Sequence, residues 1–556
     1  MTPDGFLTFL ALMVAMYAVA TPVARLRIRL RARWLQLLVA LCAFGLVLYF
    51  LFFDAWKRPC PPALGGTCEW IIFSADGSFA PAQAAFLVVL VWVLTAWLIH
   101  GLSKPSPSSL SVLSALIDDL LYEMRYAELL ALVEPHLPLI DKAARRRLPL
   151  QRLHDYLAAV GGIGDVPHIV IAGLAEERQH ERNRLSAGVA TVVGRLRFLI
   201  PRQSNAEEYA EHILRGIYRT DGLRRFMVGQ RPYAAIPLLR LDQFESRDFS
   251  ARFFGDLIAD EGSVLYQEVR ENQWSGPQGY LFPASNRLLH FLFSDAEVSN
   301  QLGVWKPIGD YVRGRLDVGV DPGYVTRLNG PATRFEEECW SDSTYVGIQL
   351  FRVMVTAAAY QGISWHMWLY YLPLFLEKLE ESYDTSNPLV DVSAEFPNRA
   401  ARLVYEIVDA LGDFVRLATR LPETSPHRDV PEGLELPNGN IPFSAAVALG
   451  QCAKTIAMSD RFGEQLGTYL HECILRDVSQ LPRDGDLGEL RAFLVDAVVH
   501  GGDTFRWRSE RPAYGPRLAH LLEGADHVLW SDARDYLIAI NAAYPEALSD
   551  HLKPRL

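Results

Sequence analysis

Three long apolar runs in the first 104 residues constrain this chain more than any other feature. They cover residues 6–24, 34–53 and 82–102, and none contains Asp, Glu, Lys or Arg. At 1.5 Å per residue, about 20 helical residues cross a hydrocarbon core of roughly 30 Å. Such runs must be helical in lipid, because lipid offers the backbone no hydrogen-bond partners. Buried helices of a soluble core are the alternative. The sequence therefore predicts a three-helix transmembrane anchor over residues 1–104.

The distribution of basic residues predicts how this anchor is oriented. The loop between the first two runs contains an arginine ladder, Arg25, Arg27, Arg29, Arg31 and Arg33. The only basic residues in the loop between the second and third runs are Lys57 and Arg58. Positive loops face the cytoplasm, so we expect the N-terminus outside and everything after residue 104 inside. The ladder is a topology signal that touches lipid headgroups, or a specific lipid or phosphate site.

A cleaved signal peptide does not explain the first run, because the residues before it carry an acid, Asp4, and no base. The preference for Arg over Lys is typical of a GC-rich bacterial genome. Together these features predict a multi-pass protein of the bacterial inner membrane.

The cysteines fit the same topology. Cys60 and Cys68 both lie in the loop expected outside, where an oxidising compartment permits a disulfide. The other four are expected to be free thiols in the membrane or the reducing cytoplasm: Cys42, Cys339, Cys452 and Cys473.

Beyond a Pro/Ser-rich linker, helical patterns follow one another, starting with an amphipathic helix from Leu110 to about Val133. Strand-like alternation is rare. We therefore predict an all-α fold, with a cytoplasmic domain at 105–420, a proline-rich loop at 421–442 and a C-terminal subdomain at 443–556. A helical-repeat stack is compatible with this pattern, although no repeat recurs at a fixed period.

One internal segment, residues 353–376, is also apolar and long enough to span a membrane. Gln361-Gly362, His366 and Pro373 interrupt it. We interpret it as two core helices that meet at Gln361–Gly362. An aromatic face that docks on a membrane or a partner is the alternative.

Charge argues against general nucleic-acid binding. Residues 1–104 contain 8 basic and 4 acidic residues, which leaves 46 basic and 61 acidic residues beyond them. Nucleic-acid affinity depends on neutralising phosphates, and this surface has the wrong sign. Basic clusters at 143–147 and 195–202 are interpreted as solvated helix ends.

Motifs for phosphate cradles, nucleophile elbows and zinc proteases are absent from the sequence. His471 and Cys473 stand two residues apart on a predicted helix and point in different directions, so they are expected to be buried rather than to bind metal. The spacing of Arg147 and His154 matches the R-x4–6-H spacing of one class of helical ribonucleases, at a frequency that chance explains. No cofactor or metal is predicted.

The best candidate for a ligand loop is a carboxylate cluster in an irregular segment: Arg334, Glu336, Glu337, Glu338 and Asp342. Such carboxylates bind Mg²⁺ or act as an acid–base pair, and solvated surface charge is the other interpretation.

These features support three hypotheses. The first is a non-enzymatic sensor or effector that assembles through its helical domain, with a protein partner or further copies, and acts on the membrane. Bacterial defence proteins that disrupt membranes share this architecture, which is analogy only. The second is a passive scaffold held at the membrane. The third is an enzyme, a nuclease or hydrolase, that uses the Glu336–Asp342 region or Arg147 and His154.

Overall fold

The computed structural model describes residues 33–52, 81–102, 107–145, 204–241, 244–273, 275–276, 279–363, 367–429, 439–502, 513–525 and 534–548, with Gly5, Thr8, Ala11 and Ala15 as isolated positions. The chain divides into two compact units, Met1–Leu223 and Arg224–Leu556. The described secondary structure is helical except for one antiparallel pair of two-residue strands, β1 (Ser275–Gly276) and β2 (Gly279–Tyr280). The prediction of an all-α fold is confirmed.

The first unit begins with two apolar helices and continues as a small helical bundle. In chain order its described elements are α3 (Arg33–Leu51), α6 (Pro81–Leu102), η2 (Pro107–Ser109), α7 (Leu110–Tyr122), α8 (Tyr126–Val133), η3 (Glu134–His136), α9 (Leu137–Ala144) and α13 (Ser204–Arg219). α13 packs against both α7 and α9. The helix expected to continue to Val133 is split, because Met124 adopts a left-handed φ of 56° that ends α7.

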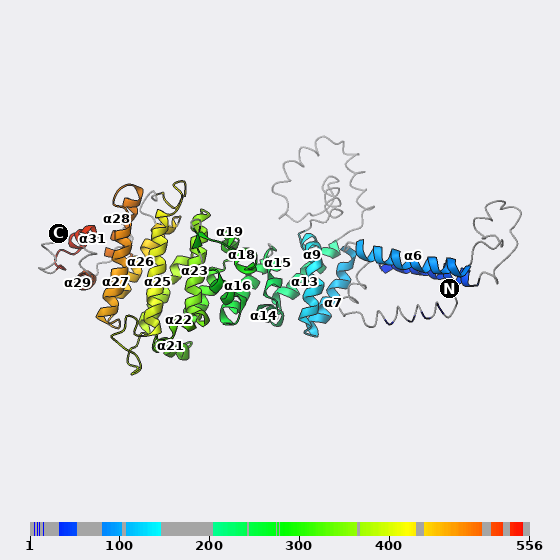
Figure 1. Ribbon diagram of the computed structural model, residues 1–556, viewed down its shortest axis with the longest axis horizontal. Helices are drawn as coiled ribbons and strands as arrows, with labels where there is room; N and C mark the ends of the chain where they lie inside the picture. The colour runs from blue at the N-terminus through cyan, green and yellow to red at the C-terminus, as the bar shows by residue number, and fades with distance from the viewer. Residues whose placement is uncertain are drawn as a thin grey trace, which may run out of the picture. The chain divides into compact units, whose positions relative to one another are not determined.

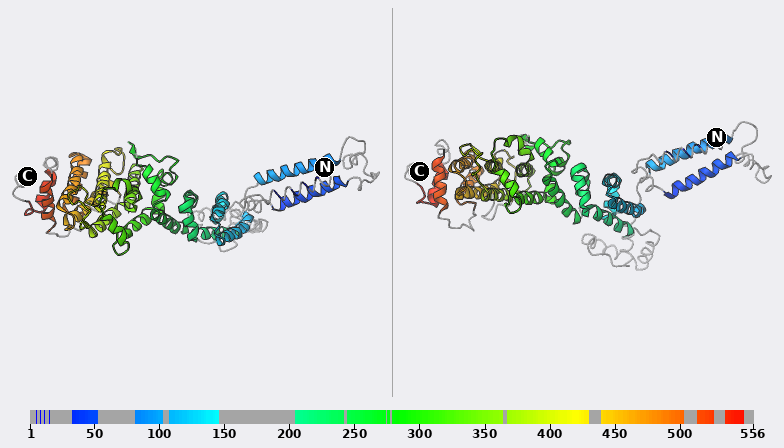
Figure 2. Two further views of the ribbon diagram at one scale, coloured as in Figure 1. Left: turned by 60° about the horizontal axis from the view of Figure 1, so that its bottom comes forward. Right: turned by 90° about the horizontal axis from the view of Figure 1, so that it is seen from below.

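The α3–α6 pair carries small side chains inside and large ones outside. The two helices lie side by side along their length (Figures 1 and 2). Side chains that are 0–7% exposed in this pair are Ala43, Val47, Ala84, Ala85 and Val89. Large apolar side chains 39–63% exposed are Leu38, Leu41, Phe44, Leu46, Phe86, Leu87, Leu90, Val91, Val93 and Leu94. A water-soluble helix pair buries its largest apolar side chains instead.

The second unit is a row of helices (Figure 1). From α23 to α27, each long helix packs against the next but one along the chain, and those from α24 onward also pack against the next one. Its elements are α14 (Asp221–Gln230, which begins before the boundary), η6 (Pro232–Ala234), α15 (Ala235–Leu239), α16 (Phe244–Ala259), α17 (Val264–Glu271), α18 (Arg287–Phe293), α19 (Ala296–Leu302), α20 (Trp305–Arg315), α21 (Pro322–Leu328), α22 (Phe335–Glu338), η7 (Cys339–Ser341), α23 (Ser343–Tyr360), η8 (Met367–Tyr370), α24 (Tyr371–Glu381), α25 (Arg399–Arg416), η9 (Leu417–Thr419), α26 (Ile441–Met458), α27 (Glu464–Gln480), α28 (Asp486–Val499), α29 (Tyr514–Gly524) and α31 (Arg534–Ala543).

Short polar side chains set the starts of several helices. Asp or Asn is the N-cap residue, and its side chain accepts a hydrogen bond from a backbone N–H of the first turn. The residues in this role are Asp295 before α19, Asp321 before α21, Asp342 before α23, Asn398 before α25 and Asn440 before α26.

The apolar segment 353–376 divides as predicted. α23 ends at Tyr360, and Gly362 follows in the left-handed region with a φ of 70°. α24 then begins at Tyr371, and its Phe375 stacks on Phe351 of α23 with ring centroids 6.1 Å apart. The segment therefore forms two packed core helices.

Among the described helices, one, α26, is long and apolar enough to cross a membrane, and 72% of it is buried inside the protein. Shorter apolar stretches, Leu38–Phe50 and Gln83–Thr95, lie in α3 and α6. α26 begins at the end of the proline-rich segment at 421–442. It packs against α25, which precedes this segment, and against α28, which follows it. The helices before and after that segment both lie in the unit Arg224–Leu556.

Candidate functional site

Most carboxylates of the predicted ligand loop are paired within the protein. Glu338 lies 2.5 Å from an Arg399 guanidinium nitrogen, and Glu336 lies 3.2 Å from one of Arg402. Arg334 precedes α22, and Glu337 is exposed on it. Ion pairs therefore join this loop to α25.

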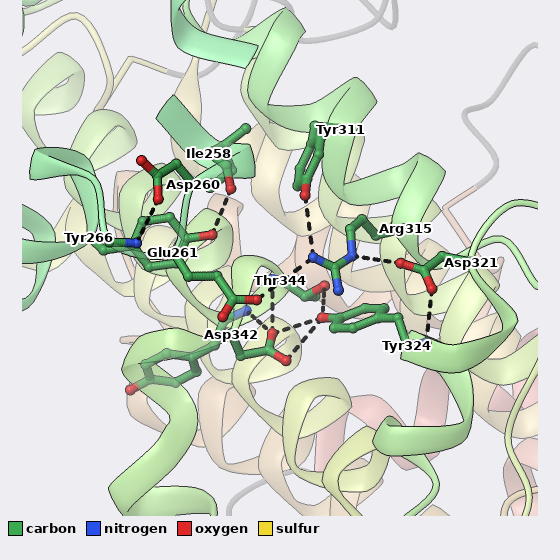
Figure 3. A network of polar contacts seen from close by, with 12 residues as sticks. Ile258, Asp260, Glu261, Tyr266, Tyr311, Arg315, Asp321, Tyr324, Asp342 and Thr344 are labelled. Carbon is green, nitrogen blue, oxygen red and sulfur yellow. Dashed lines mark hydrogen bonds and ion pairs between the residues drawn. The ribbon is translucent and has the colours of Figure 1, made fainter. Parts of the chain in front are cut away.

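Asp342 belongs to a second network (Figure 3). It caps α23 by accepting the backbone N–H groups of Thr344 and Tyr345 at 2.9 and 3.0 Å. The hydroxyl of Tyr324 donates to the same carboxylate at 2.8 Å and lies 2.7 Å from Thr344 Oγ1. Burial raises the pKa of Asp342, and these hydrogen bonds oppose the rise.

Arg315 extends this network from α20. Its guanidinium lies 4.1 Å from the centroid of the Tyr324 ring, 3.1 Å from Asp321 and 3.9 Å from Glu261 (Figure 3). The arrangement ties the α16–α17 turn, α20, α21 and α23 together. Since its acid groups already contact a cation or hydroxyl, it is suited to fixing these elements in place.

A third set of charges joins α23, α25 and α27. Gln349 donates to Glu406 at 3.1 Å, and Arg402 lies 3.1 Å from the same carboxylate. Arg352 pairs with Asp409 at 2.6 Å. Arg416 pairs with both Asp413 and Asp477. Burial raises the pKa of Glu406, and the nearby arginines lower it.

His471 and Cys473 are both buried and do not share a ligand position. His471 Nε2 lies 3.4 Å from the hydroxyl of Tyr536, and burial lowers its pKa to about 4. Burial raises the pKa of the Cys473 thiol to about 11, which makes it a poor nucleophile. Cys42, Cys339, Cys452 and Cys473 are free. Among the described residues, no group of three or more His, Cys, Asp or Glu side chains is arranged to hold a metal ion.

Several predicted sites lie outside the described residues: Arg25, Arg27, Arg29, Arg31, Cys60, Cys68, Arg147, His154 and most of the first apolar run, residues 6–24. Arg33 is described as the first residue of α3.

A cleft of about 650 Å³ opens between α27, the end of α29 and the loop from α24 to α25. We call it the glutamate cleft, and its lining residues are Glu395, Glu464, Gln465, Thr468, Tyr469, Glu472 and Gly524. These include three glutamates and no Lys or Arg. His520, on α29, lies 3.4 Å from Glu464. Tyr469 hydrogen-bonds Glu395, and burial raises the pKa of this tyrosine.

The walls of the glutamate cleft are held by aromatic packing. Phe396, Tyr405 and Tyr469 form a cluster with ring centroids 5.3–5.9 Å apart. This cluster joins the α24–α25 loop to α25 and α27. Asn398 anchors the end of the loop, since it donates to Asp384 O at 3.0 Å and accepts from Ala401 N–H at 2.8 Å.

Sequence reasoning did not find this cleft. Glu395 and Tyr469 are 74 positions apart in the sequence, and no motif links them. A further shallow cleft of about 460 Å³ between α28 and α31 has a floor that includes Ala492, Ala539 and Ala542. Asp535 at its edge is held by Arg491 through two contacts of 2.7 Å.

Comparisons with protein-family models, curated proteins and solved structures find no match for this chain.

Proposed function

We propose that this chain is an integral membrane protein whose α3–α6 pair anchors a helical binding module to the bilayer. The observation that carries the proposal is the outward placement of large apolar side chains on both helices, around a seam that includes Ala43, Ala84 and Ala85. In lipid, helix pairs approach through small residues, while Leu, Phe and Val face the acyl chains.

Helix lengths support the same proposal. α3 has 19 residues and α6 has 22. At 1.5 Å per residue they span roughly 28 and 33 Å, which matches a hydrocarbon core of about 30 Å. The arginine ladder before α3 is the basis for proposing a cytoplasmic module at an inner membrane, with the loop at 53–80 outside.

Cys42 offers a direct test because it lies in the middle of α3 and is exposed on the protein surface, whereas Cys339, Cys452 and Cys473 are buried. In a Cys60→Ser/Cys68→Ser background, native membranes are treated with a water-soluble maleimide. A charged, water-soluble maleimide does not enter the hydrocarbon core, so Cys42 should react only after solubilisation in SDS. A Glu489→Cys variant reports on a site outside the anchor and should react at once. Rapid labelling of Cys42 in intact membranes refutes the proposal.

Extraction provides a second measurement. The wild-type chain should stay in the membrane pellet after an alkaline carbonate wash. A Leu41→Glu/Leu90→Glu variant should be released more readily, because a carboxylate at the centre of a membrane helix costs about 3 kcal/mol on insertion scales. Release of the wild type by carbonate contradicts membrane anchoring.

An anchor replacement separates a passive tether from an effector. Residues 1–104 are exchanged for an unrelated membrane anchor, and cell growth and membrane potential are followed. Retained function supports a tethered binding module. Lost function, with the module still folded and at the membrane, supports an effector whose helix bundle acts on the bilayer.

A further inference from the structure

α3 has a second face, on the side away from α6, where small residues lie at the surface. Ala43 and Val47, 7% and 1% exposed, belong to the buried seam with α6. Gly45 lies two positions from each of them, which is about 160° around a helix of 3.6 residues per turn. Cys42 and Gly45 are both exposed, and no atom lies within 4 Å of a Cβ added at Gly45.

This side of the helix is defined by a spacing of four, three and four residues, which keeps side chains in one line. We call it the outer face of α3, and its residues are Leu38, Cys42, Gly45 and Tyr49.

Gly45 is an unfavourable residue for a helix surface that meets only acyl chains. Other exposed residues of α3 include Leu41, Phe44 and Leu46, which are 45–63% exposed. Glycine is a poorer helix former than alanine, and it offers lipid no side chain to contact. In membrane proteins, small residues occur where a second helix approaches the backbone closely. The outer face therefore has the composition of a helix-packing surface.

The apolar run at residues 6–24 is the nearest segment along the chain that can cover this face. It is joined to α3 by eight residues, 25–32. So short a connection places successive helices of a bundle side by side and antiparallel. Because α6 packs against the seam side of α3, the outer face is left for this run.

Four described positions of the N-terminal segment carry a matching surface. Gly5, Thr8, Ala11 and Ala15 are helical and exposed. Their spacing sets Thr8, Ala11 and Ala15 within about 60° of one another around the helix. All of these side chains are small, as the close approach of two membrane helices requires.

Depth in the membrane pairs specific positions of the two segments. In antiparallel neighbours, residues equally far from the connecting loop lie at the same level. Ala15 lies nine residues before the end of its run, and Cys42 lies nine residues after the start of α3, so both are about 14 Å from the loop. Ala11 and Gly45 lie 13 and 12 residues from the same ends, which is about 19 Å. The small residues of the two segments therefore coincide in depth.

We infer that the helix of residues 6–24 packs on the outer face of α3, with Ala15 against Cys42 and Ala11 against Gly45. This inference rests on the proposed membrane anchor and names the segment that completes it. α3 is then the central helix of the anchor, with a small-residue contact to each neighbour. A second copy of α3 is the competing occupant, and it would bring two Cys42 thiols together instead.

Disulfide formation in native membranes tests the inference. An Ala15→Cys/Cys60→Ser/Cys68→Ser variant has five thiols: the introduced one, Cys42 and the three buried thiols of the second unit. After oxidation with copper phenanthroline, the protein is denatured in SDS and its free thiols are coupled to a maleimide polymer. A disulfide needs Cα atoms within about 7 Å, so the inferred packing should leave three added polymers instead of five. The product should run as a monomer on a nonreducing gel.

The position of the introduced thiol is the first control. Met13→Cys, in place of Ala15→Cys, moves the thiol by two residues and about 160° around the helix, and it should keep five added polymers. A Val47→Cys/Ala85→Cys pair at the buried seam, with Cys42→Ser, shows that the oxidant reaches this depth.

The size of the residue at position 45 is the second control. Gly45→Leu in the Ala15→Cys variant fills the space of the neighbouring helix and should reduce the disulfide yield about fivefold or more. Val91→Leu enlarges a 58% exposed side chain of α6 and should leave the yield unchanged.

Three results overturn the inference: five polymers added to the Ala15→Cys variant; equal disulfide yields for Met13→Cys and Ala15→Cys; or a covalent dimer through Cys42 as the main product, which assigns the outer face to a second copy. Maleimide labelling of Cys42 distinguishes this failure from failure of the anchor proposal. A protein that protects Cys42 in intact membranes but forms no disulfide with position 15 loses only the present inference.

Discussion

Two buried histidines predict a specific loss of stability in mild acid. His427 is fully buried between helices, and its Nδ1 accepts the backbone N–H of Ile441 at 3.3 Å. His471 is 1% exposed and faces Tyr536. Burial lowers the pKa of each to about 4, from an ordinary value of 6.5, because an imidazolium loses its hydration there.

The direction and size of the effect follow from linkage between protonation and folding. Both folded-state pKa values are depressed. The stability that the two neutral histidines contribute is therefore present in full above about pH 6.5, declines as the pH falls, and is gone below about pH 4. From pH 7 to pH 5, each histidine should lower the free energy of unfolding by about 2 kcal/mol, and the complete loss at lower pH is about 3 kcal/mol.

Urea unfolding of the full-length chain in nonionic detergent, followed by tryptophan fluorescence at pH 7 and pH 5, measures this loss. His427→Asn keeps an acceptor near the position of Nδ1, and His471→Gln keeps a polar group near that of Nε2. Each variant should recover about 2 kcal/mol of the difference between the two pH values, with an unchanged denaturant slope. His290→Asn, at an exposed position on α18, should behave as the wild type. If both buried variants retain the full pH dependence of the wild type, the reasoning is wrong.

Other sites give independent tests by thermal or urea unfolding. Gly450→Ala should destabilise the second unit by about 2 kcal/mol or more, because an added Cβ would collide with a backbone carbonyl oxygen of α28. Gly314→Ala is the control, since no atom lies within 4 Å of the added Cβ there. This variant should be neutral or stabilise the unit by up to about 1 kcal/mol. Tyr324→Phe should cost about 1–3 kcal/mol, since it removes the hydroxyl that donates to buried Asp342. Glu268→Ala should cost about 3 kcal/mol, because it leaves two backbone N–H groups at the start of α18 and a tyrosine hydroxyl unpaired, while Glu268→Gln should cost less. Equal effects within either matched pair would contradict the packing or hydrogen-bond argument.

The sequence determined much of the local structure. Helical periodicity, few strand signals and the break at Gln361–Gly362 all correspond to elements of the fold. These features depend on interactions between residues a few positions apart, which a single sequence displays directly. The split of the first bundle helix at Met124 was not predictable in this way, because Met is a good helix former and its left-handed φ depends on how α7 and α8 pack.

The candidate sites, in contrast, depend on contacts between residues that are far apart in the sequence. Glu336 and Arg402 are 66 positions apart in the sequence, and folding brings their charged groups to 3.2 Å. The glutamate cleft depends on a loop, the first turns of α27 and the last residue of α29 meeting in space. A charge in a sequence has no partner until the chain is folded, because electrostatic and packing contacts depend on distance in space rather than along the chain.

The apolar runs at the N-terminus show both effects, that of local sequence and that of tertiary packing. Composition predicted helices at residues 34–53 and 82–102, and α3 (Arg33–Leu51) and α6 (Pro81–Leu102) lie within these stretches or one residue beyond them. The packing of α3 against α6 sets which side chains the pair exposes, because the choice between Ala43 inside and Leu41 outside depends on how closely the two helices approach. Helix formation is a local property of the backbone, whereas the face a helix exposes is set by its neighbours.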